Sequence, residues 1–213
     1  EWHTCPQEEK INASNPCSEY MFIDDTACNL ASLNLIKFSL GDKSFNVEAF
    51  KHACRLWTLT LEISVMMAQF PSKEIAQKSF DYRTLGLGYA NIGGLLMSWG
   101  VPYDSDEGRA ICASISALMT GVSYATSAEI AKELGAFSKY EINSKDMLRV
   151  IKNHKKAADG YKDGYDSLTI RPVPLIKEDC SITELPKAAT LAWDKALDLG
   201  SKYGYRNAQT TVI

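Results

Sequence analysis

The segment Ala27-Cys-Asn-Leu-Ala-Ser-Leu-Asn-Leu35 has the alternating pattern of a β-strand. Every second residue from Ala31 to Leu35 is apolar, and Asn34 falls on the opposite side. A period of two predicts a strand, and a helix is the alternative. A second strand is predicted over residues 82–89, where Gly86 and Gly88 lead into a helix over residues 90–99.

Longer helical patterns fill most of the remaining chain. Asn46 is suited to cap a helix that runs through Phe70 and ends before Pro71, and because its apolar residues lie nearly all round, we expect this helix to be buried. Asp104 and Glu107 have the spacing of a capping box, which predicts a long helix ending at Gly135.

Two further helices and a closing strand complete the pattern. Ser144 is predicted to cap a helix with Met147, Val150, Ile151, His154 and Ala158 on one face. Residues 159–180 are rich in Gly, Asp, Pro and Lys, so they are predicted to form a surface loop. Pro186 opens a last helix to about Leu199, and residues 209–213 predict a strand.

Strands separated by helices indicate an α/β fold that is rich in helix. Residues 1–45 are expected to form loops and a strand, and residues 46–213 to be mainly helical with short strands. Because the chain opens without Met and closes within a strand pattern, we expect a piece of a longer polypeptide. The pattern fits part of an α/β barrel or of a doubly wound sheet, cut at both ends.

Composition and charge narrow the classes of function. The 213 residues carry a formal charge of −3, which gives no electrostatic basis for non-specific binding to nucleic acids or anionic membranes. No apolar run is long enough to be expected to cross a bilayer, and the first residues do not show the charged-then-apolar pattern expected of a leader. The six cysteines show neither Cys-x-x-Cys pairs nor zinc-type spacing, which predicts reduced thiols, no metal site and a cytoplasmic location.

The segment Asn15-Pro-Cys-Ser-Glu19 is the strongest candidate for chemistry. Pro16 disfavours helix and pushes Asn15 into an extended conformation, so Asn15, Cys17 and Glu19 are expected to project from one side of an extended segment. An amide, a thiol and a carboxylate would then converge on one small ligand.

The charges around Cys17 favour one type of thiol chemistry. A nucleophilic cysteine needs a nearby cation or His, but no Lys, Arg or His lies between Lys10 and Lys37. A carboxylate such as Glu19 instead keeps a neighbouring thiol protonated. A protonated thiol beside a general base suits donation of a hydrogen atom and formation of a thiyl radical.

Two segments together show a family resemblance. Asn15-Pro-Cys-Ser-Glu-Tyr20 and Asp24-Asp-Thr-Ala-Cys-Asn-Leu-Ala-Ser-Leu-Asn-Leu35 resemble the active-site region of ribonucleotide reductase large subunits, most closely the adenosylcobalamin-dependent class II. Supporting similarity lies in Glu1-Trp-His-Thr-Cys-Pro6, Arg83-Thr-Leu-Gly-Leu-Gly-Tyr-Ala-Asn91 and Tyr203-Gly-Tyr-Arg-Asn-Ala-Gln209. The resemblance implies part of a ten-stranded α/β barrel and reduction of ribonucleotides to 2′-deoxyribonucleotides for DNA synthesis.

The resemblance also implies a role for each residue of the motif. Cys17 matches the radical cysteine that takes the 3′ hydrogen atom of the ribose. Glu19 matches the carboxylate that accepts the 3′-hydroxyl proton, and Asn15 the amide that binds the ribose hydroxyls. Residues 15–19, with Pro16 and Ser18, would contact substrate. Cys28 matches one member of the redox cysteine pair, whose partner lies upstream in these enzymes.

The same resemblance implies cofactors and partners for a full-length enzyme. These are adenosylcobalamin, a ribonucleoside di- or triphosphate, a thioredoxin- or glutaredoxin-type reductant, dNTP or ATP effectors, and a homodimer. Because the partner of Cys28 and the phosphate-binding loop would lie outside residues 1–213, this chain alone is predicted to be inactive.

Other interpretations remain open at this point. A class I large subunit, which receives its radical from a metal-containing subunit, shares the same motif. A helical interaction module in which the motif is coincidental, and a thiol-nucleophile enzyme, are hypotheses from other classes. The nucleophile hypothesis predicts fast alkylation of Cys17, whereas the radical hypothesis predicts slow alkylation.

The remaining cysteines and glycines have simpler interpretations. Cys54 and Cys112 lie in apolar helical stretches and are expected in the core. Cys180 lies in a polar loop and is expected to be exposed, and Cys5 near His3 offers too few ligands for a metal. Gly86-Leu-Gly88 does not complete a dinucleotide-binding motif, so close packing of strand against helix is expected.

Overall fold

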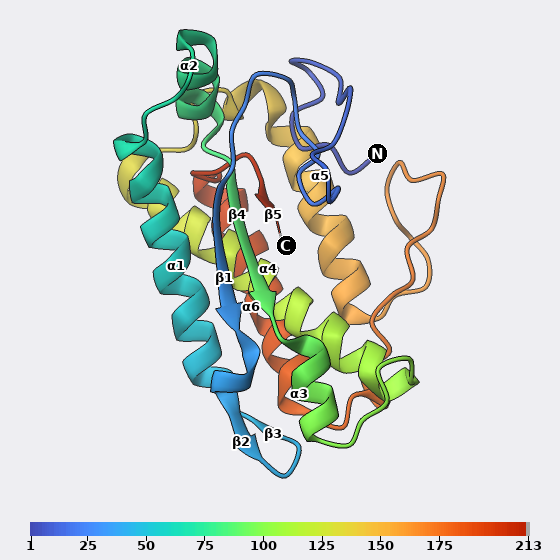
Figure 1. Cartoon of the computed structure of the whole chain (residues 1–213). Coiled ribbons are helices and arrows are strands. Elements are labelled where there is room, and N and C mark those ends of the chain that lie inside the picture. The colour runs from blue at the N-terminus through green and yellow to red at the C-terminus, as the bar shows by residue number, and fades with distance from the viewer. Residues whose placement is uncertain (212–213) are drawn as a thin grey trace.

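The computed structural model describes residues 1–211 as a small parallel sheet covered by helices (Figure 1). Residues 212–213, at the end of the predicted closing strand, lie outside the described residues. The strands are β1 (Asn29–Asn34), β2 (Ser39–Gly41), β3 (Ser44–Phe45), β4 (Leu85–Ala90) and β5 (Thr210–Thr211). The α-helices are α1 (Val47–Met67), α2 (Lys73–Tyr82), α3 (Ile92–Ser98), α4 (Asp106–Leu134), α5 (Tyr140–Asp159) and α6 (Glu184–Tyr203), and the 3-10 helices are η1 (Leu35–Phe38) and η2 (Lys177–Asp179).

The main sheet has the parallel order β1-β4-β5, and β2 and β3 form a small antiparallel pair. Asn29 pairs with Leu85, and Leu85 pairs with Thr210, so the first residues of the three strands lie at one level. Helices connect the parallel strands, which confirms the predicted helix-rich α/β class. Within the described residues these strands do not close a barrel.

The two faces of β4 carry different side chains: leucines on one face and glycines on the other. Leu85 and Leu87 are buried in the core that α1 and α4 share with the sheet. A Cβ added to Gly86 would meet Leu30 Cδ2 at 2.5 Å and Cys28 Sγ at 2.7 Å. The expectation of strand-to-helix packing at this glycine is therefore wrong, because its absent side chain opens space beside Cys28.

The capping residues partly follow the sequence pattern. Asn46 caps α1 by accepting a hydrogen bond from the Ala49 N–H, as predicted. Ser105 caps α4 through the Gly108 N–H, so the expected Asp104 capping box is wrong by one residue. Ser144 lies inside α5, where its hydroxyl donates to the Glu141 carbonyl, so its predicted capping role is wrong.

Helix α2 has no counterpart in the sequence prediction. Ser72 caps it through the Ile75 N–H, and Arg83 ends it in the left-handed conformation at φ 53°. Tyr82 is therefore helical, and the second strand starts at Leu85 rather than at residue 82. The pattern over Lys73–Tyr82 is weak because only Ser79 and Tyr82 are buried.

Helix α1 buries one face rather than its whole circumference. Phe50, Cys54 and Leu61 lie in the core, whereas Ile63 and Met67 on the other side are 59% and 77% exposed. The expectation of burial all round is wrong for the chain described here.

Helix α4 is long and apolar enough to meet the length and composition criteria for a membrane span, contrary to the sequence expectation. However, 67% of its most apolar window is buried within the protein. It packs most extensively against α6 and also against α1, as Figure 1 shows. This burial is typical of the core helix of a globular domain.

Candidate functional site

The segment that contains the motif folds into a tight turn. The Ser18 N–H donates to the Asn15 carbonyl at 3.0 Å, and the Asn15 N–H donates to the Tyr20 carbonyl at 3.3 Å. Pro16 occupies the second position of this turn, which the fixed φ of proline favours as well as it favours extended chain. The predicted extended geometry is therefore wrong.

The turn nevertheless brings Asn15 and Glu19 together. The Asn15 Nδ2 donates to Glu19 Oε1, and the Asn15 Oδ1 accepts the Tyr20 N–H at 3.0 Å. Both ends of the amide are thus used to orient the carboxylate. Glu19 Oε2 is buried without a hydrogen-bond partner among the described residues. An acceptor of this kind needs a donor, from water or from a ligand.

The three other residues of the motif lie at the tip of the turn. Cys17 is an exposed free thiol, and Pro16 and Ser18 are exposed beside it. Ser18 has φ 61° and its hydroxyl lies 3.1 Å from that of Ser14. The structure therefore presents the Cys17 thiol outward, on the segment that also positions Glu19.

Cys28 lies immediately before β1, and its thiol faces Gly86. Burial, together with the charge of Glu19, raises the pKa of the Cys28 thiol to about 12. The thiol therefore stays protonated at neutral pH. Cys28 is a free, half-buried cysteine in this chain, as expected. Glu19 is thus hydrogen-bonded to Asn15 and close enough to Cys28 to influence its ionisation.

A set of hydroxyl groups anchors this segment, and the sequence analysis did not identify it. The Tyr20 hydroxyl donates to Thr26 Oγ1 at 2.8 Å and lies 2.9 Å from Thr84 Oγ1. Thr84 in turn donates to the Ala27 carbonyl at 2.7 Å. Burial raises the pKa of Tyr20 to about 12, so the phenol remains a donor. Nothing in the sequence signals these pairs, because Thr84 is remote from Tyr20 along the chain.

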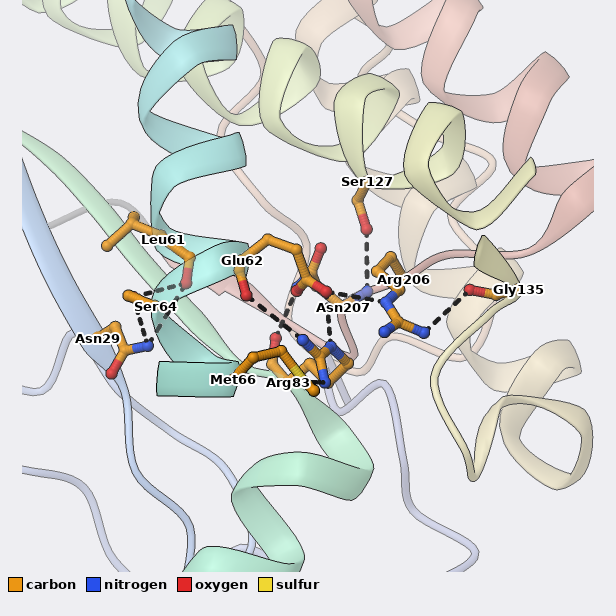
Figure 2. Close-up of polar contacts among 10 residues, drawn as sticks. All are labelled: Asn29, Leu61, Glu62, Ser64, Met66, Arg83, Ser127, Gly135, Arg206 and Asn207. Carbon is orange, nitrogen blue, oxygen red and sulfur yellow. Dashed lines mark hydrogen bonds and ion pairs between the residues drawn. The ribbon is translucent and has the colours of Figure 1, made fainter. Parts of the chain in front are cut away.

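A second polar cluster surrounds the buried Glu62 of α1, and of its other members Arg83 and Asn207 are buried and Arg206 is half-buried (Figure 2). Glu62 Oε1 accepts from Arg83 Nε at 2.7 Å and from Arg206 Nε at 2.8 Å. Glu62 Oε2 accepts from Asn207 Nδ2 at 2.7 Å. We call these four residues the Glu62 cluster. It joins α1 to the residues that precede β4 and β5.

Backbone contacts extend the Glu62 cluster. Asn207 Nδ2 also donates to the Arg83 carbonyl at 2.8 Å, and the Asn207 N–H donates to Ser127 Oγ at 2.9 Å. Burial lowers the pKa of Arg83, while the Glu62 charge opposes that shift. Sequence reasoning missed Glu62 because it interrupts an apolar helix, although Arg83, Arg206 and Asn207 all lie in segments that show the family resemblance.

The remaining cysteines take mainly structural places. Cys54 is buried as expected, and Cys112 is half-buried with its sulfur 3.2 Å from the Tyr89 hydroxyl. Cys180 is buried, so its predicted exposure is wrong. Its neighbour Ile182 accepts a hydrogen bond from the thiol and is itself buried, which draws this end of the loop inward.

The described residues contain no cluster of three or more His, Cys, Asp or Glu side chains that could hold a metal ion. The Cys5 N–H donates to His3 Nδ1 at 3.4 Å within a local turn. His154 lies half-buried on α5, as expected, and stacks on Trp193 with ring centroids 5.5 Å apart. Burial lowers the pKa of His154 to about 4.

Comparison with known proteins covers the whole chain. Residues 1–213 match the family described as "Ribonucleotide reductase, barrel domain". A "Vitamin B12-dependent ribonucleotide reductase" of Agrobacterium fabrum is 64% identical over 214 residues, which cover 100% of this chain and 17% of that protein.

Two further proteins with the same name are similar. That of Bradyrhizobium diazoefficiens is 62% identical over 100% of this chain and 17% of its own length. That of Rhodopirellula baltica is 48% identical over 100% of this chain and 19% of its own length. The chain therefore spans less than a fifth of the length of these curated relatives.

Proposed function

The chain belongs to the ribonucleotide reductase barrel-domain family, and on this premise we propose that it forms part of the catalytic barrel of an adenosylcobalamin-dependent ribonucleotide reductase. The observation that supports this proposal most directly is the placement of Glu19. Its carboxylate is oriented by Asn15, lies close to Cys28, and keeps Oε2 free of any partner among the described residues.

Cys17 is the proposed radical residue. Its exposure at the tip of a turn leaves the thiol accessible to a hydrogen-atom acceptor and to a substrate. The hydrogen on a ribose carbon is not acidic, so ordinary acid–base groups cannot remove it and a radical is required. The Cys17 thiyl would take the 3′ hydrogen atom, with the C–H bond breaking as the S–H bond forms.

Glu19 and Asn15 would then act on the ribose hydroxyls. The unpartnered Glu19 Oε2 is suited to accept the proton of the 3′-hydroxyl, which assists loss of the 2′-hydroxyl as water. Asn15 holds Glu19 through its Nδ2, so the carboxylate needs no reorientation when substrate arrives.

Cys28 would supply one of the two reducing thiols. Because its pKa is raised to about 12, the thiol retains its proton at neutral pH and can deliver it together with reducing electrons. A disulfide with a second cysteine of the full-length protein would be the oxidised product. A thioredoxin- or glutaredoxin-type reductant would restore the two thiols.

Adenosylcobalamin, when bound to the full-length enzyme, would supply the one-electron chemistry that generates the Cys17 thiyl. The residues described here are compatible with this cofactor in one respect: the Cys17 thiol is exposed and therefore accessible to it. The name that the curated relatives share favours this cofactor over the radical from a metal-containing subunit of class I.

The remaining parts of the proposal concern the whole protein. They comprise a ribonucleoside di- or triphosphate substrate, dNTP or ATP effectors, a homodimer and a cytoplasmic location. Family membership favours the reductase over a helical interaction module. Slow alkylation of Cys17, against the thiol-nucleophile hypothesis, stays a prediction.

The full-length protein tests this function directly. Deoxyribonucleotide formation is expected only when adenosylcobalamin is added with a ribonucleotide and a dithiol reductant. Activity with a metal-containing subunit and no cobalamin would favour class I and contradict the proposal. The 213-residue chain alone is expected to show no turnover, because the redox partner of Cys28 is expected outside residues 1–213.

A further inference from the structure

The segment Glu19-Tyr-Met21 crosses the sheet at the level where the three parallel strands begin. Asn29, Leu85 and Thr210 are the first residues of β1, β4 and β5 and are paired in register. The residues that precede them, Cys28, Thr84 and Gln209, therefore also share a level, one directly before each strand. Figure 1 shows the three strands side by side in this order.

Two residues of the crossing segment contact residues that directly precede a strand. The charge of Glu19 also helps to raise the pKa of the Cys28 thiol, just before β1. The Tyr20 hydroxyl lies 2.9 Å from Thr84 Oγ1. The Met21 carbonyl accepts from Gln209 Nε2 at 3.1 Å. The Tyr20 contact holds the segment at the start of β4, and the Gln209 contact holds it at the start of β5.

The orientation of the Gln209 amide follows from chemistry. A backbone carbonyl such as Met21 O can only accept, so the group facing it is the amide nitrogen. Gln209 Oε1 then points elsewhere, and it is buried without a partner among the described residues, as is Glu19 Oε2. Two acceptors without a partner among the described residues thus flank the same segment, and a donor for them must come from outside residues 1–211, as from water or a ligand.

Gln209 stands on a firmly held backbone. Its carbonyl accepts the Leu85 N–H at 3.0 Å. Two residues earlier, Asn207 is fixed to Glu62 at 2.7 Å and to Ser127 at 2.9 Å. Because the backbone of Gln209 is fixed independently of the crossing segment, its side chain can hold that segment in one place.

We propose that Gln209 is a positioning residue of the ribonucleotide site: by holding the Met21 carbonyl it fixes the crossing segment and, with it, the Glu19 carboxylate. This inference rests on the proposed function. Gln209 acts through Glu19 and is not itself a catalytic residue.

Kinetics of the full-length enzyme test this role with two variants. Gln209→Met keeps the length of the side chain but has no donor, and Gln209→Glu keeps its shape but presents an acceptor to the Met21 carbonyl. Both are expected to lower kcat by about 10- to 100-fold, because a displacement near 1 Å costs rate of that order. The dissociation constant for the ribonucleotide is expected to change by less than about threefold. The thermal midpoint is expected to shift by no more than about 2 °C.

Gln77→Met is the matched control. Gln77 also donates through its Nε2, to Asp81 Oδ2 at 3.0 Å, but on the exposed side of α2. Its kcat is expected to equal that of the parent enzyme. An unchanged kcat in Gln209→Glu would overturn the proposal. A fall in kcat that follows a matching fall in thermal midpoint would also overturn it, since this result indicates general destabilisation.

A second measurement does not depend on turnover. Residue-specific alkylation of the full-length protein, followed by peptide mass spectrometry, reports how accessible the Cys28 thiol is. Gln209→Met is expected to raise the alkylation rate of Cys28 at least about threefold, and to leave that of buried Cys54 unchanged. Equal Cys28 rates in the variant and the parent would overturn the proposal, whereas an inactive parent with a raised Cys28 rate would count against the proposed function alone.

Discussion

Two glutamates of this chain sit in opposite settings. Glu62 is 5% exposed, and both of its carboxylate oxygens are paired with donors from Arg83, Arg206 and Asn207. Glu19 is half-buried, has one oxygen paired with Asn15, and leaves the other buried without a partner. The carboxylate of Glu62 thus has partners on both oxygens, whereas that of Glu19 keeps one oxygen without a partner among the described residues.

The difference separates structure from chemistry. A buried carboxylate with both oxygens already paired is poorly placed to bind substrate, so the Glu62 cluster is suited to join α1 with the residues that precede β4 and β5. A carboxylate with one free oxygen can accept a proton or a hydroxyl. Substitutions at the two positions should therefore affect different properties.

Glu62→Gln should produce the largest loss of stability. The amide would remove the negative charge that compensates Arg83 and Arg206, and it would bring a donor against Asn207 Nδ2. Breaking a buried ion pair in this way costs about 3–5 kcal/mol of unfolding free energy. Urea denaturation followed by tryptophan fluorescence measures this loss.

Glu48→Gln serves as the control on the same helix. Its side chain is 81% exposed and pairs with Lys51 at the surface, so a change of at most about 0.5 kcal/mol is expected. Similar unfolding free energies for Glu62→Gln and Glu48→Gln would contradict the structural role of the Glu62 cluster.

Glu19→Gln should lower activity strongly and stability only slightly, the reverse of what is expected for Glu62→Gln. Its Oε1 can still accept from Asn15, so the unfolding free energy is expected to fall by less than about 1 kcal/mol. The loss of a proton acceptor is expected to lower kcat of the full-length enzyme by about 10² to 10³-fold. Steady-state kinetics measure the effect, and a variant with parental kcat would remove Glu19 from the proposed chemistry.

Gly86→Ala should lower kcat by less than Glu19→Gln does. Gly86 lies in β4, beside the Cys28 thiol. The new Cβ would lie 2.5 Å from the Leu30 side chain, which is 60% exposed and can move away, and 2.7 Å from Cys28 Sγ. We expect displacement of the thiol to lower kcat by about tenfold, with at most about 1 kcal/mol of destabilisation.

Gly93→Ala is the comparison for this substitution. A Cβ there would meet only ring carbons of Tyr103 at 4.0 Å, an ordinary contact, so the activity of the full-length enzyme should be unchanged. Equal kinetics for the Gly86 and Gly93 variants would show that the space beside Cys28 is not needed.

Sequence patterns predicted the elements whose signals are local. Asn46 and Gly135 mark the start of α1 and the end of α4 correctly, because capping groups bond within one turn of helix. The start of α5 was missed because packing of Tyr140 on Phe137 and Tyr205 helps to fix it, and Ser144 is equally able to bond inside a helix.

The candidate site was predictable by residue type but not by conformation. Proline is compatible with both a turn and an extended chain, and the turn is selected by bonds from Asn15 to Tyr20 and Glu19. Gln209 lies 188 residues from the carbonyl that it holds, and Asn207 lies 145 from Glu62. Periodicity and spacing contain no signal for pairs at such separations.

We propose that the turn between Asn15 and Tyr20 presents the Cys17 thiol for one-electron chemistry on a ribonucleotide. The most direct measurement is deoxyribonucleotide formation by the full-length Cys17→Ser enzyme with adenosylcobalamin, beside Cys112→Ser as a control on α4. Because Cys17 is exposed, the account predicts a loss of at least about 10³-fold in turnover with an unchanged thermal midpoint, while the control stays active. Turnover by Cys17→Ser at the parental rate would contradict it.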